Sequence, residues 1–199
     1  FNSTRLRDEL LFRFDTLLTG TFPPLSAASY SFPHWFIGAV DFSFMHLVWA
    51  LAVLGAYLFI AHSRLFREAI GAFFLGLMIL YASWLMFPVL SPHDRFIDNV
   101  YNLPIVPEAR SYVQEYQPQE EIRTFLTGMR ESKENLTVLP TSTFPSAHVA
   151  WATLLVYYAW RLSRWLGLIA FPFAALSSLG TFLFAQHYFV DLPAGIIVS

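Results

Sequence analysis

The stretch FSFMHLVWALAVLGAYLFIA, residues 42–61, contains no charged side chain and decides the class of the protein. A helix needs about 20 mostly apolar residues to cross the hydrocarbon core of a bilayer. Two more uncharged runs meet this requirement, at residues 69–90 and 165–186. None of the three alternates with a period of two residues, and lipid excludes open strands. The sequence therefore predicts transmembrane helices.

The composition of the 199 residues also favours a membrane protein. Hydrophobic residues make up 56% of the chain and charged residues 13%, whereas soluble domains carry about 25% charged residues. The aromatic fraction of 18% is too large for the core of so small a soluble protein. A net charge of −2 gives no basic face for nucleic acid. Because the chain has no cysteine, disulfides, thiolate catalysis and cysteine-bound zinc are excluded.

Two further apolar segments complete the predicted bundle. The run at 149–160 becomes a span if its helix starts near Pro145 and the arginines after it reach the far interface, and another span opens at Leu192. We predict an all-α, polytopic transmembrane helical bundle with spans at about 36–61, 68–90, 146–163, 165–187 and from 192 onward. We expect 1–199 to be a single membrane-embedded domain, truncated at both ends.

Basic residues in the short loops predict the orientation of the bundle. Arg64 and Arg67 lie between the first two spans, and Arg161 and Arg164 lie between the next two. Short loops rich in arginine lie on the cytoplasmic side. The polar segment 91–147 and the junction after the fourth span should then lie on the non-cytoplasmic face. This face is the secretory lumen in a eukaryote, and the periplasmic or extracellular side in a bacterium.

Two amphipathic segments on that side are predicted to lie on the membrane surface. Charged residues alternate with leucine and phenylalanine over residues 5–15, which is typical of an interfacial helix. After Pro118 come two glutamates and then an apolar stripe at helical spacing, formed by Ile122, Phe125, Leu126 and Met129. We expect this second helix to cover lipid rather than to form a binding groove.

Two histidine motifs give the strongest chemical signal. In Phe-Pro-Ser-Ala-His, residues 144–148, proline suits the first turn of a helix and Ser146 can cap it, so free N–H groups form an anion site. His187 and Asp191 stand four residues apart, a spacing at which a carboxylate can fix one imidazole nitrogen and free the other. The 39 residues from His148 to His187 correspond to about 58 Å of helix, or two bilayer crossings. Both motifs should therefore meet at one membrane face.

Two imidazoles beside an anion site suit phosphoryl transfer, in which one attacks phosphorus and the other protonates the leaving oxygen. A metal site is a second interpretation, because the two histidines and Asp191 offer ligands. No glutamate lies nearby, however, and an anion-binding helix start disfavours a cation. A third interpretation is structural, with a histidine in the first turn of a helix and an interfacial His–Asp pair.

The sequence resembles the type 2 phosphatidic acid phosphatase superfamily. The specific part of the resemblance is FPSAH at 144–148 and HYFVDLPAG at 187–195, which are similar to its second and third signatures. The stretches FDTLLTG at 14–20 and FPVLSP at 87–92 look closest to its inositolphosphotransferase branch, which includes fungal inositol phosphorylceramide synthase. The resemblance thus covers most of the chain.

The resemblance implies a role for each motif residue. His187 would be the nucleophile, and Asp191 would be the carboxylate that orients it. His148 would act as the acid and base, and Ser146 would hold a phosphate oxygen. The superfamily needs no metal, so the resemblance implies no metal and no other cofactor.

Departures from the signatures bear on the substrate. The first signature, a lysine followed by an Arg-Pro pair, is absent, and Gly180 and Thr181 replace the Ser-Arg that opens the third. A site with few cations suits a phosphodiester monoanion better than a phosphate monoester, whose second pKa is about 6. We predict that Arg95 is the remaining phosphate contact. The missing cations also fit a weakened or inactive enzyme.

We predict a membrane phosphotransferase that moves a phosphoryl-linked head group from a phospholipid to a lipid or alcohol acceptor through a phospho-histidine, as in inositol phosphorylceramide synthase. A lipid phosphate phosphatase, with water as the acceptor, is the first alternative. A non-catalytic scaffold or transporter of the same fold is the second, although a transporter should carry more polar midspan residues than His46. The expected partners are a phospholipid or sphingolipid substrate and membrane lipid, with no nucleic acid. The sequence leaves the oligomeric state open.

Overall fold

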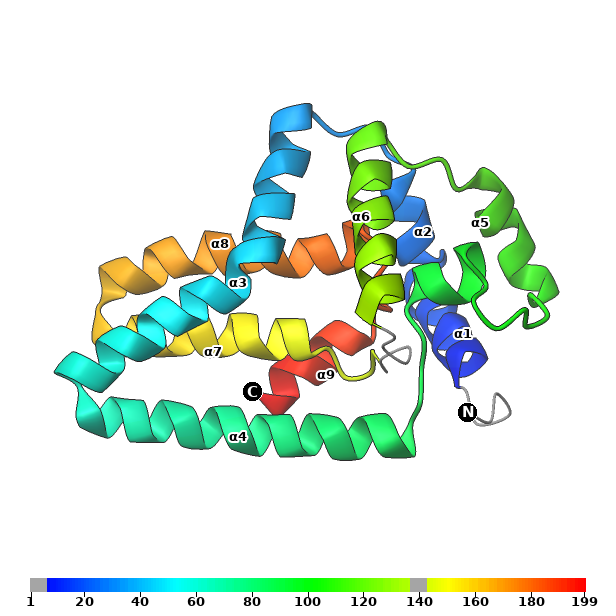
Figure 1. Cartoon of the computed structure of the whole chain (residues 1–199). Coiled ribbons are helices and arrows are strands. Elements are labelled where there is room, and N and C mark those ends of the chain that lie inside the picture. The colour runs from blue at the N-terminus through cyan, green and yellow to red at the C-terminus, as the bar shows by residue number, and fades with distance from the viewer. Residues whose placement is uncertain (1–6, 137–142) are drawn as a thin grey trace.

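A computed structural model of the chain describes residues 7–136 and 143–199, which form helices joined by short segments (Figure 1). No strand occurs in these two ranges. Among the described residues, three helices are long and apolar enough to cross a membrane: α3 (His34–Ala61), α4 (Ser63–Met86) and α8 (Arg164–Leu183). The prediction of an all-α helical membrane protein is confirmed.

Two more helices correspond to the predicted third and fifth spans. The helix α7 (Ala147–Leu162) packs against α3 and α8, where Leu47, Leu155 and Ala174 form a buried cluster. The helix α9 (Asp191–Val198) is formed by residues near the end of the sequence. The 16 residues of α7 measure about 24 Å, a little less than the hydrocarbon core.

Helix ends differ from the predicted spans at two places that bear on the site. The helix α4 ends at Met86 rather than near 90, because the residue before Pro88 is disfavoured in the helical conformation. The helix α8 ends at Leu183 rather than at 187, and Ala185 then adopts a positive φ of 48°. Residues 184–190 therefore form a turn, and the second histidine motif does not lie on one continuous helix.

The two basic turns lie at the same end of the bundle. The Nη2 atom of Arg161 is 3.4 Å from Oε2 of Glu68, which joins the turn between α7 and α8 to the first turns of α4. Below this pair, Leu58, Leu154 and Tyr158 pack together from α3 and α7. The polar segments gather at the opposite end, as Figure 1 shows.

Six short elements build this polar end. They are α1 (Asp8–Thr19), α2 (Pro23–Ala28), the π-helix η2 (His93–Ile97), the 3₁₀ helix η3 (Pro107–Ala109), α5 (Arg110–Glu115) and α6 (Glu120–Leu136). Their core is aromatic: Phe22 packs against Phe12, Phe96 and Tyr188 at ring-centroid distances of 4.8, 5.4 and 5.9 Å. Burial of large aromatic rings holds the short helices together.

The helix α1 forms where the amphipathic pattern predicts it, and its buried face holds two aspartates beside Leu11 and Phe12. Asp8 and Asp15 are 1% and 0% exposed, whereas Leu10 and Leu17 are 58% and 81% exposed. Residues 5 and 6 of the predicted segment lie outside the described residues. Both aspartates accept backbone hydrogen bonds inside the protein, a role that the amphipathic pattern did not indicate.

The helix α6 is also present, but its apolar stripe does not cover lipid. Ile122 and Leu126 are buried against Ile37 of α3, and the ring of Phe125 stacks on Phe184 at 3.8 Å. The prediction of a cover on lipid is wrong because the first turns of α3 and the end of α8 offer this stripe an apolar protein surface. The helix thus covers the end of the bundle that carries the histidine motifs.

Gly195 allows α9 to lie against the start of α7. A Cβ atom at this position would lie 2.5 Å from the backbone oxygen of Ser146 and 3.1 Å from Cβ of Val149. The N–H of Ser146 in turn donates to the carbonyl oxygen of Asp191 at 3.2 Å. A glycine therefore brings the two histidine motifs into backbone contact.

We predict that Gly195→Ala lowers the free energy of unfolding by about 1–3 kcal/mol, because the extra methyl overpacks a backbone contact. The measurement is thermal unfolding in detergent. Gly38→Ala is the matched control, since a Cβ atom at Gly38 meets nothing within 4 Å. Equal stability of the two variants would contradict the prediction.

Candidate active site

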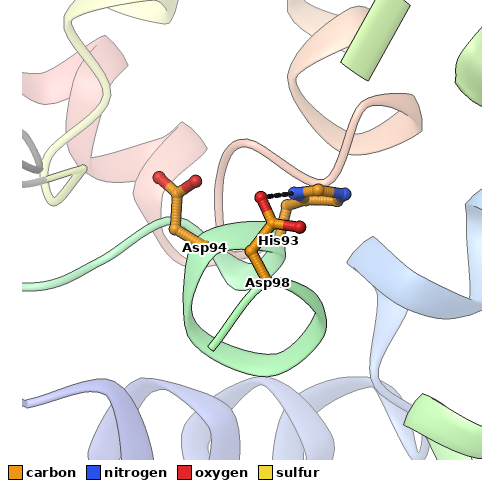
Figure 2. A group of neighbouring side chains, drawn as sticks. All are labelled: His93, Asp94 and Asp98. Atoms are coloured by element: carbon orange, nitrogen blue, oxygen red, sulfur yellow. Dashed lines mark ion pairs between the residues drawn. The ribbon is translucent and has the colours of Figure 1, made fainter. Parts of the chain in front are cut away.

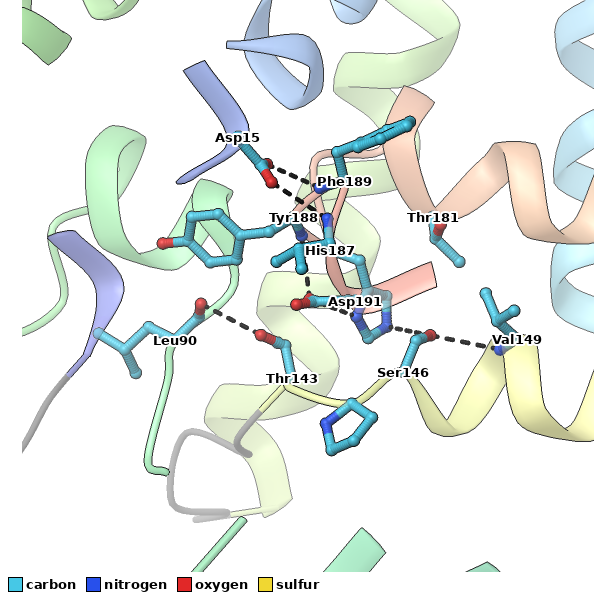
Figure 3. A network of polar contacts seen from close by, with 12 residues as sticks. Asp15, Leu90, Thr143, Ser146, Val149, Thr181, His187, Tyr188, Phe189 and Asp191 are labelled. Carbon is cyan, nitrogen blue, oxygen red and sulfur yellow. Dashed lines mark hydrogen bonds and ion pairs between the residues drawn. The ribbon is translucent and has the colours of Figure 1, made fainter. Parts of the chain in front are cut away.

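The turn between α8 and α9 is held by backbone hydrogen bonds to the last turns of α8. The carbonyl oxygen of Thr181 accepts from the N–H groups of Gln186 and His187 at 2.9 and 3.1 Å. The hydroxyl of Thr181 donates to the carbonyl oxygen of Ser178 at 2.6 Å. The chain thereby reverses direction and carries His187 back toward the start of α7 (Figure 3).

A buried carboxylate fixes the imidazole of His187. Its Nδ1 lies 3.1 Å from Oδ2 of Asp191, which is 0% exposed. The same oxygen accepts from the N–H of Tyr188 at 3.0 Å. Since an ionised carboxylate only accepts hydrogen bonds, Nδ1 carries the proton and Nε2 keeps its lone pair.

The free nitrogen of His187 faces the start of α7. The hydroxyl of Ser146 lies 3.2 Å from this Nε2 and donates to it, and the same Oγ accepts from the N–H of Val149 at 3.2 Å (Figure 3). Ser146 is therefore the N-cap that the sequence indicates. Within the described residues, the N–H groups of Ala147 and His148 donate to no protein acceptor. A nucleophilic nitrogen, a hydroxyl and a helix start thus converge, a combination suited to an anion.

His148 lies beside this group but makes different contacts. Its ring stacks on Phe44 of α3 at a centroid distance of 4.2 Å, and its Nε2 lies 2.7 Å from Oγ of Ser177 in α8. Within the described residues, no hydrogen bond joins the rings of His148 and His187. Ser177 is a site residue that no sequence motif revealed.

The position of Phe44 explains one departure from the superfamily signature. A Cβ atom on Gly180 would lie 2.9 Å from Cδ2 of Phe44, so the ring that stacks on His148 occupies the space of a side chain there. The next residue, Thr181, is 0% exposed and bonded to its own helix. Gly180 therefore leaves room for the ring that stacks on His148, and the carbonyl oxygen of Thr181 holds the backbone of His187.

Asp15 of α1 holds the other side of the turn. Its Oδ2 and Oδ1 accept from the N–H groups of Phe189 and Val190 at 2.7 and 3.0 Å. Burial raises the pKa of Asp15 to about 7, against the opposing effect of these two donors. Asp15 belongs to the stretch FDTLLTG, so in the sequence only the resemblance marked its surroundings.

Asp8, two turns before Asp15 on α1, binds the segment that precedes η2. Its Oδ1 accepts from the N–H of Leu90 at 2.7 Å and from the hydroxyl of Tyr188 at 3.4 Å. Burial raises the pKa of Asp8 to about 6. The two aspartates of α1 thus connect the first helix to both chain segments around the histidine motifs.

Arg95 lies in this buried layer, and within the described residues none of its hydrogen-bond or ring contacts is with Ser146 or His187. It is 3% exposed, and its Nη2 donates to the carbonyl oxygen of Pro104 at 2.8 Å. Burial raises the pKa of Asp8 and of the Tyr188 hydroxyl, and the positive charge of Arg95 opposes this increase in both. The ring of Tyr188 points away from the imidazole of His187 in Figure 3. The Nη1 atom is buried without a hydrogen-bond partner. A phosphate contact by Arg95 stays a prediction.

A second polar cluster adjoins the turn. The ligand atoms of His93, Asp94 and Asp98 lie within 4.8 Å of one another (Figure 2) and line a pocket of about 280 Å³ together with Arg130 and Gln186. Asp98 is paired with His93 at 3.5 Å and with Arg130 at 3.7 Å. Of the described residues these are the ones that come nearest to a metal site. We assign them no ion, because two side chains already balance Asp98.

His46, the midspan polar residue, takes no part in the site. Its Nδ1 bonds to the carbonyl oxygen of Phe42 one turn before at 2.8 Å, and its ring stacks on the ring of the same residue. The side chain is exposed on the outer face of α3. It therefore lines no polar passage through the bundle.

The fold and the site define a helical membrane protein with a histidine–aspartate pair, a serine hydroxyl and a second histidine gathered at one end of its spans. Residues 10–199 match the family described as the PAP2 superfamily, and the chain belongs to this superfamily. Its members are generally phosphatases or phosphotransferases. Comparison with curated proteins and with solved structures gave no match.

We predict that Asp15→Asn reduces the pH dependence of stability. Burial raises the pKa of Asp15 from 3.8 to about 7, so between these values the native state holds a proton that the unfolded chain has released. The free energy of unfolding then falls as the pH rises through this window. The decrease in melting temperature from pH 5 to pH 8 should be smaller in the variant by about 2–8 °C.

The control for this measurement is Glu9→Gln, because Glu9 is exposed on the same helix. It should retain the wild-type dependence of melting temperature on pH. An unchanged dependence in Asp15→Asn would show that Asp15 does not titrate in this range.

Proposed function

We propose that this chain is a membrane phosphotransferase that moves a phosphoryl-linked head group from a phospholipid to an alcohol or lipid acceptor. The proposed reaction is like that of inositol phosphorylceramide synthase, which belongs to the branch that the sequence resembles. The observation that carries the proposal is the pair of bonds around His187, which fix one nitrogen on Asp191 and direct the other to Ser146. An imidazole held in this way is an activated nucleophile.

In the proposed first step, Nε2 of His187 attacks the phosphorus of the donor lipid. A phosphorus–nitrogen bond forms, and the bond from phosphorus to the glyceride oxygen breaks. His148 gives a proton to that oxygen, and Asp191 stabilises the positive charge on the phosphorylated imidazole. The hydroxyl of Ser146 turns from Nε2 to a phosphate oxygen.

In the second step, His148 takes the proton of the acceptor hydroxyl, whose oxygen attacks phosphorus. The phosphorus–nitrogen bond breaks, and His187 recovers its lone pair. The N–H groups at the start of α7 stabilise negative charge on the phosphate oxygens in both steps. No residue needs a metal for this sequence, and we propose that the reaction is metal-independent.

The charges around the site favour a diester donor. The buried carboxylates of Asp8, Asp15 and Asp191 surround the turn, and Gly180 and Thr181 stand where the superfamily signature has serine and arginine. A dianionic monoester would meet more repulsion there than a monoanionic diester. We therefore propose a phospholipid diester or a sphingolipid as the partner in the membrane.

The polar pocket beside the turn supports a hydroxyl-bearing head group. It is lined by the carboxylates of Asp94 and Asp98, by the guanidinium of Arg130, which pairs with Asp98, and by Gln186, which precedes His187 in the chain. Carboxylates accept hydrogen bonds from hydroxyl groups, while guanidinium and amide groups donate to their oxygens. Such a mixed set suits an alcohol better than a second phosphate.

We further propose that the active site faces the non-cytoplasmic side, since the basic turns lie at the opposite end of the bundle. The test uses single-cysteine variants of the chain, which has no cysteine of its own. Glu108→Cys should react with an impermeant thiol reagent from outside, whereas Ser63→Cys should react only after permeabilisation. Both positions are exposed. The reverse pattern would place the site in the cytoplasm.

We predict that wild-type protein transfers the head group of a labelled phospholipid diester to an added alcohol acceptor, inositol or ceramide among them, in the presence of a chelator. His187→Ala should abolish covalent capture of phosphate, because no nitrogen remains to attack. Asp191→Asn should retain capture but slow it by roughly 10²- to 10⁴-fold, because the imidazole loses its charged partner.

Labelled phosphatidic acid is the competing substrate in the same assay. Release of free phosphate from it, without transfer from the diester, would identify a phosphatase and refute the charge argument. Full capture in both His187→Ala and Asp191→Asn would refute the histidine–aspartate mechanism. Absence of both transfer and phosphate release in the wild type would leave a non-catalytic protein of this fold.

A further inference from the structure

The buried hydroxyl of Ser177 in α8 bonds to another helix rather than to its own. Serine and threonine inside a helix commonly donate to a carbonyl oxygen three or four residues earlier, as Thr153 and Thr181 do at 2.8 and 2.6 Å. Among the described residues, Oγ of Ser177 instead has Nε2 of His148 in α7 as its partner, 2.7 Å away. Because Ser177 is 0% exposed, bulk water does not compete for this contact.

Two contacts from different helices define the orientation of the His148 ring. The ring of Phe44 in α3 stacks on it with an interplanar angle of 14°, which sets the plane of the imidazole. A half turn of the ring would keep this plane and exchange nitrogen with carbon positions, since the last torsion of histidine is roughly two-fold. The bond to Ser177 removes this freedom, because a ring nitrogen forms the hydrogen bond and a ring carbon does not.

The same bond determines which nitrogen of His148 is left for a substrate. Within the described residues, the hydrogen bond of this ring is made by Nε2, and Nδ1 has no hydrogen-bond partner. A hydroxyl donates to an unprotonated nitrogen and accepts from a protonated one. Ser177 can therefore stay bonded to Nε2 while Nδ1 gains and loses a proton.

We infer that Ser177 is a positioning residue, which holds Nε2 of His148 so that Nδ1 exchanges protons with the substrate. The inference rests on the proposed function for the reaction itself. In the first step, His148 starts with a proton on both nitrogens, and Nδ1 gives its proton to the glyceride oxygen as the phosphorus–oxygen bond breaks. In the second step, Nδ1 takes the proton of the acceptor hydroxyl, which restores the doubly protonated ring. Nε2 keeps its proton throughout, and Oγ of Ser177 accepts it.

The leaving group of the donor lipid distinguishes this role from a structural one. A glyceride oxygen is strongly basic and leaves slowly unless it receives a proton, whereas nitrophenolate is a weak base that leaves without one. Protonation by a well-placed acid typically contributes about 10²–10⁴-fold to a rate. A misplaced His148 therefore slows the reaction of the glyceride donor alone, while a disturbed fold slows attack on both donors.

The measurement is the single-turnover rate of phosphate capture at His187 from two phosphodiesters with the same head group. One has diacylglycerol as its leaving group and the other has nitrophenol. Ser177→Ala should slow capture from the diacylglycerol donor by roughly 10- to 100-fold and leave the nitrophenyl donor within about twofold. Ser178→Ala is the matched control, because the adjacent side chain of Ser178 makes no hydrogen bond within the described residues. It should match the wild type with both donors.

Two further variants test whether Ser177 acts through His148. Once the imidazole is removed, the hydroxyl has nothing to position, so His148→Ala and the double variant with Ser177→Ala should capture from the diacylglycerol donor at the same rate. Ser177→Cys keeps a side chain of similar size but offers only a weak hydrogen-bonding group. It should show the same selective loss to a smaller extent.

Equal loss with both donors in Ser177→Ala and Ser177→Cys would overturn the inference, and so would an undiminished rate with the diacylglycerol donor. A further loss in the double variant would also overturn it, because Ser177 would then act independently of His148. Absence of capture from both donors by the wild type would instead refute the proposed function and, with it, the role of Ser177 in that reaction.

Discussion

One buried turn, residues 184–190, determines how the rest of the structure is arranged. The turn has no regular secondary structure, so its N–H groups need partners that other elements must bring to it. Thr181 supplies a carbonyl oxygen from α8, Asp191 supplies a carboxylate from α9, and Asp15 supplies a second carboxylate from α1. Each partner comes from a different helix, and His187 is held still only when all three are in place. This requirement explains why α1, which is far away in the sequence, is packed against the turn.

The sequence carried enough information for the fold class and for the two histidine motifs, because both depend on local patterns. Uncharged runs define the spans directly, and proline with serine before His148 defines the start of a helix. The roles of Asp15 and Ser177 depend on tertiary contacts, and no pattern in a single sequence reveals them. An amphipathic helix in water and one that turns its acids into a protein have the same periodicity. The sequence therefore predicted that α1 and α6 are helices, but not the protein surfaces against which they pack.

The buried charges also limit what the site can bind. Desolvation raises the pKa of both aspartates on α1, and the charge of Asp191 raises that of Asp15 further. Arg95 is the buried cation that acts on Asp8, and its contacts lie with the aromatic layer behind the turn. Neutral donors at the start of α7 can stabilise a monoanion without introducing a further cation.

The proposed reaction sets one further constraint on the site. The reacting phosphorus would have to stay at the polar end of the spans, while the lipid that carries it diffuses within the bilayer. A nucleophile fixed to within a hydrogen-bond length is useful only if the substrate is fixed equally well. The ring of Phe44 stacks on His148, and its helix α3 is long and apolar enough to cross a membrane. The same helix therefore spans the membrane and holds the second histidine in place.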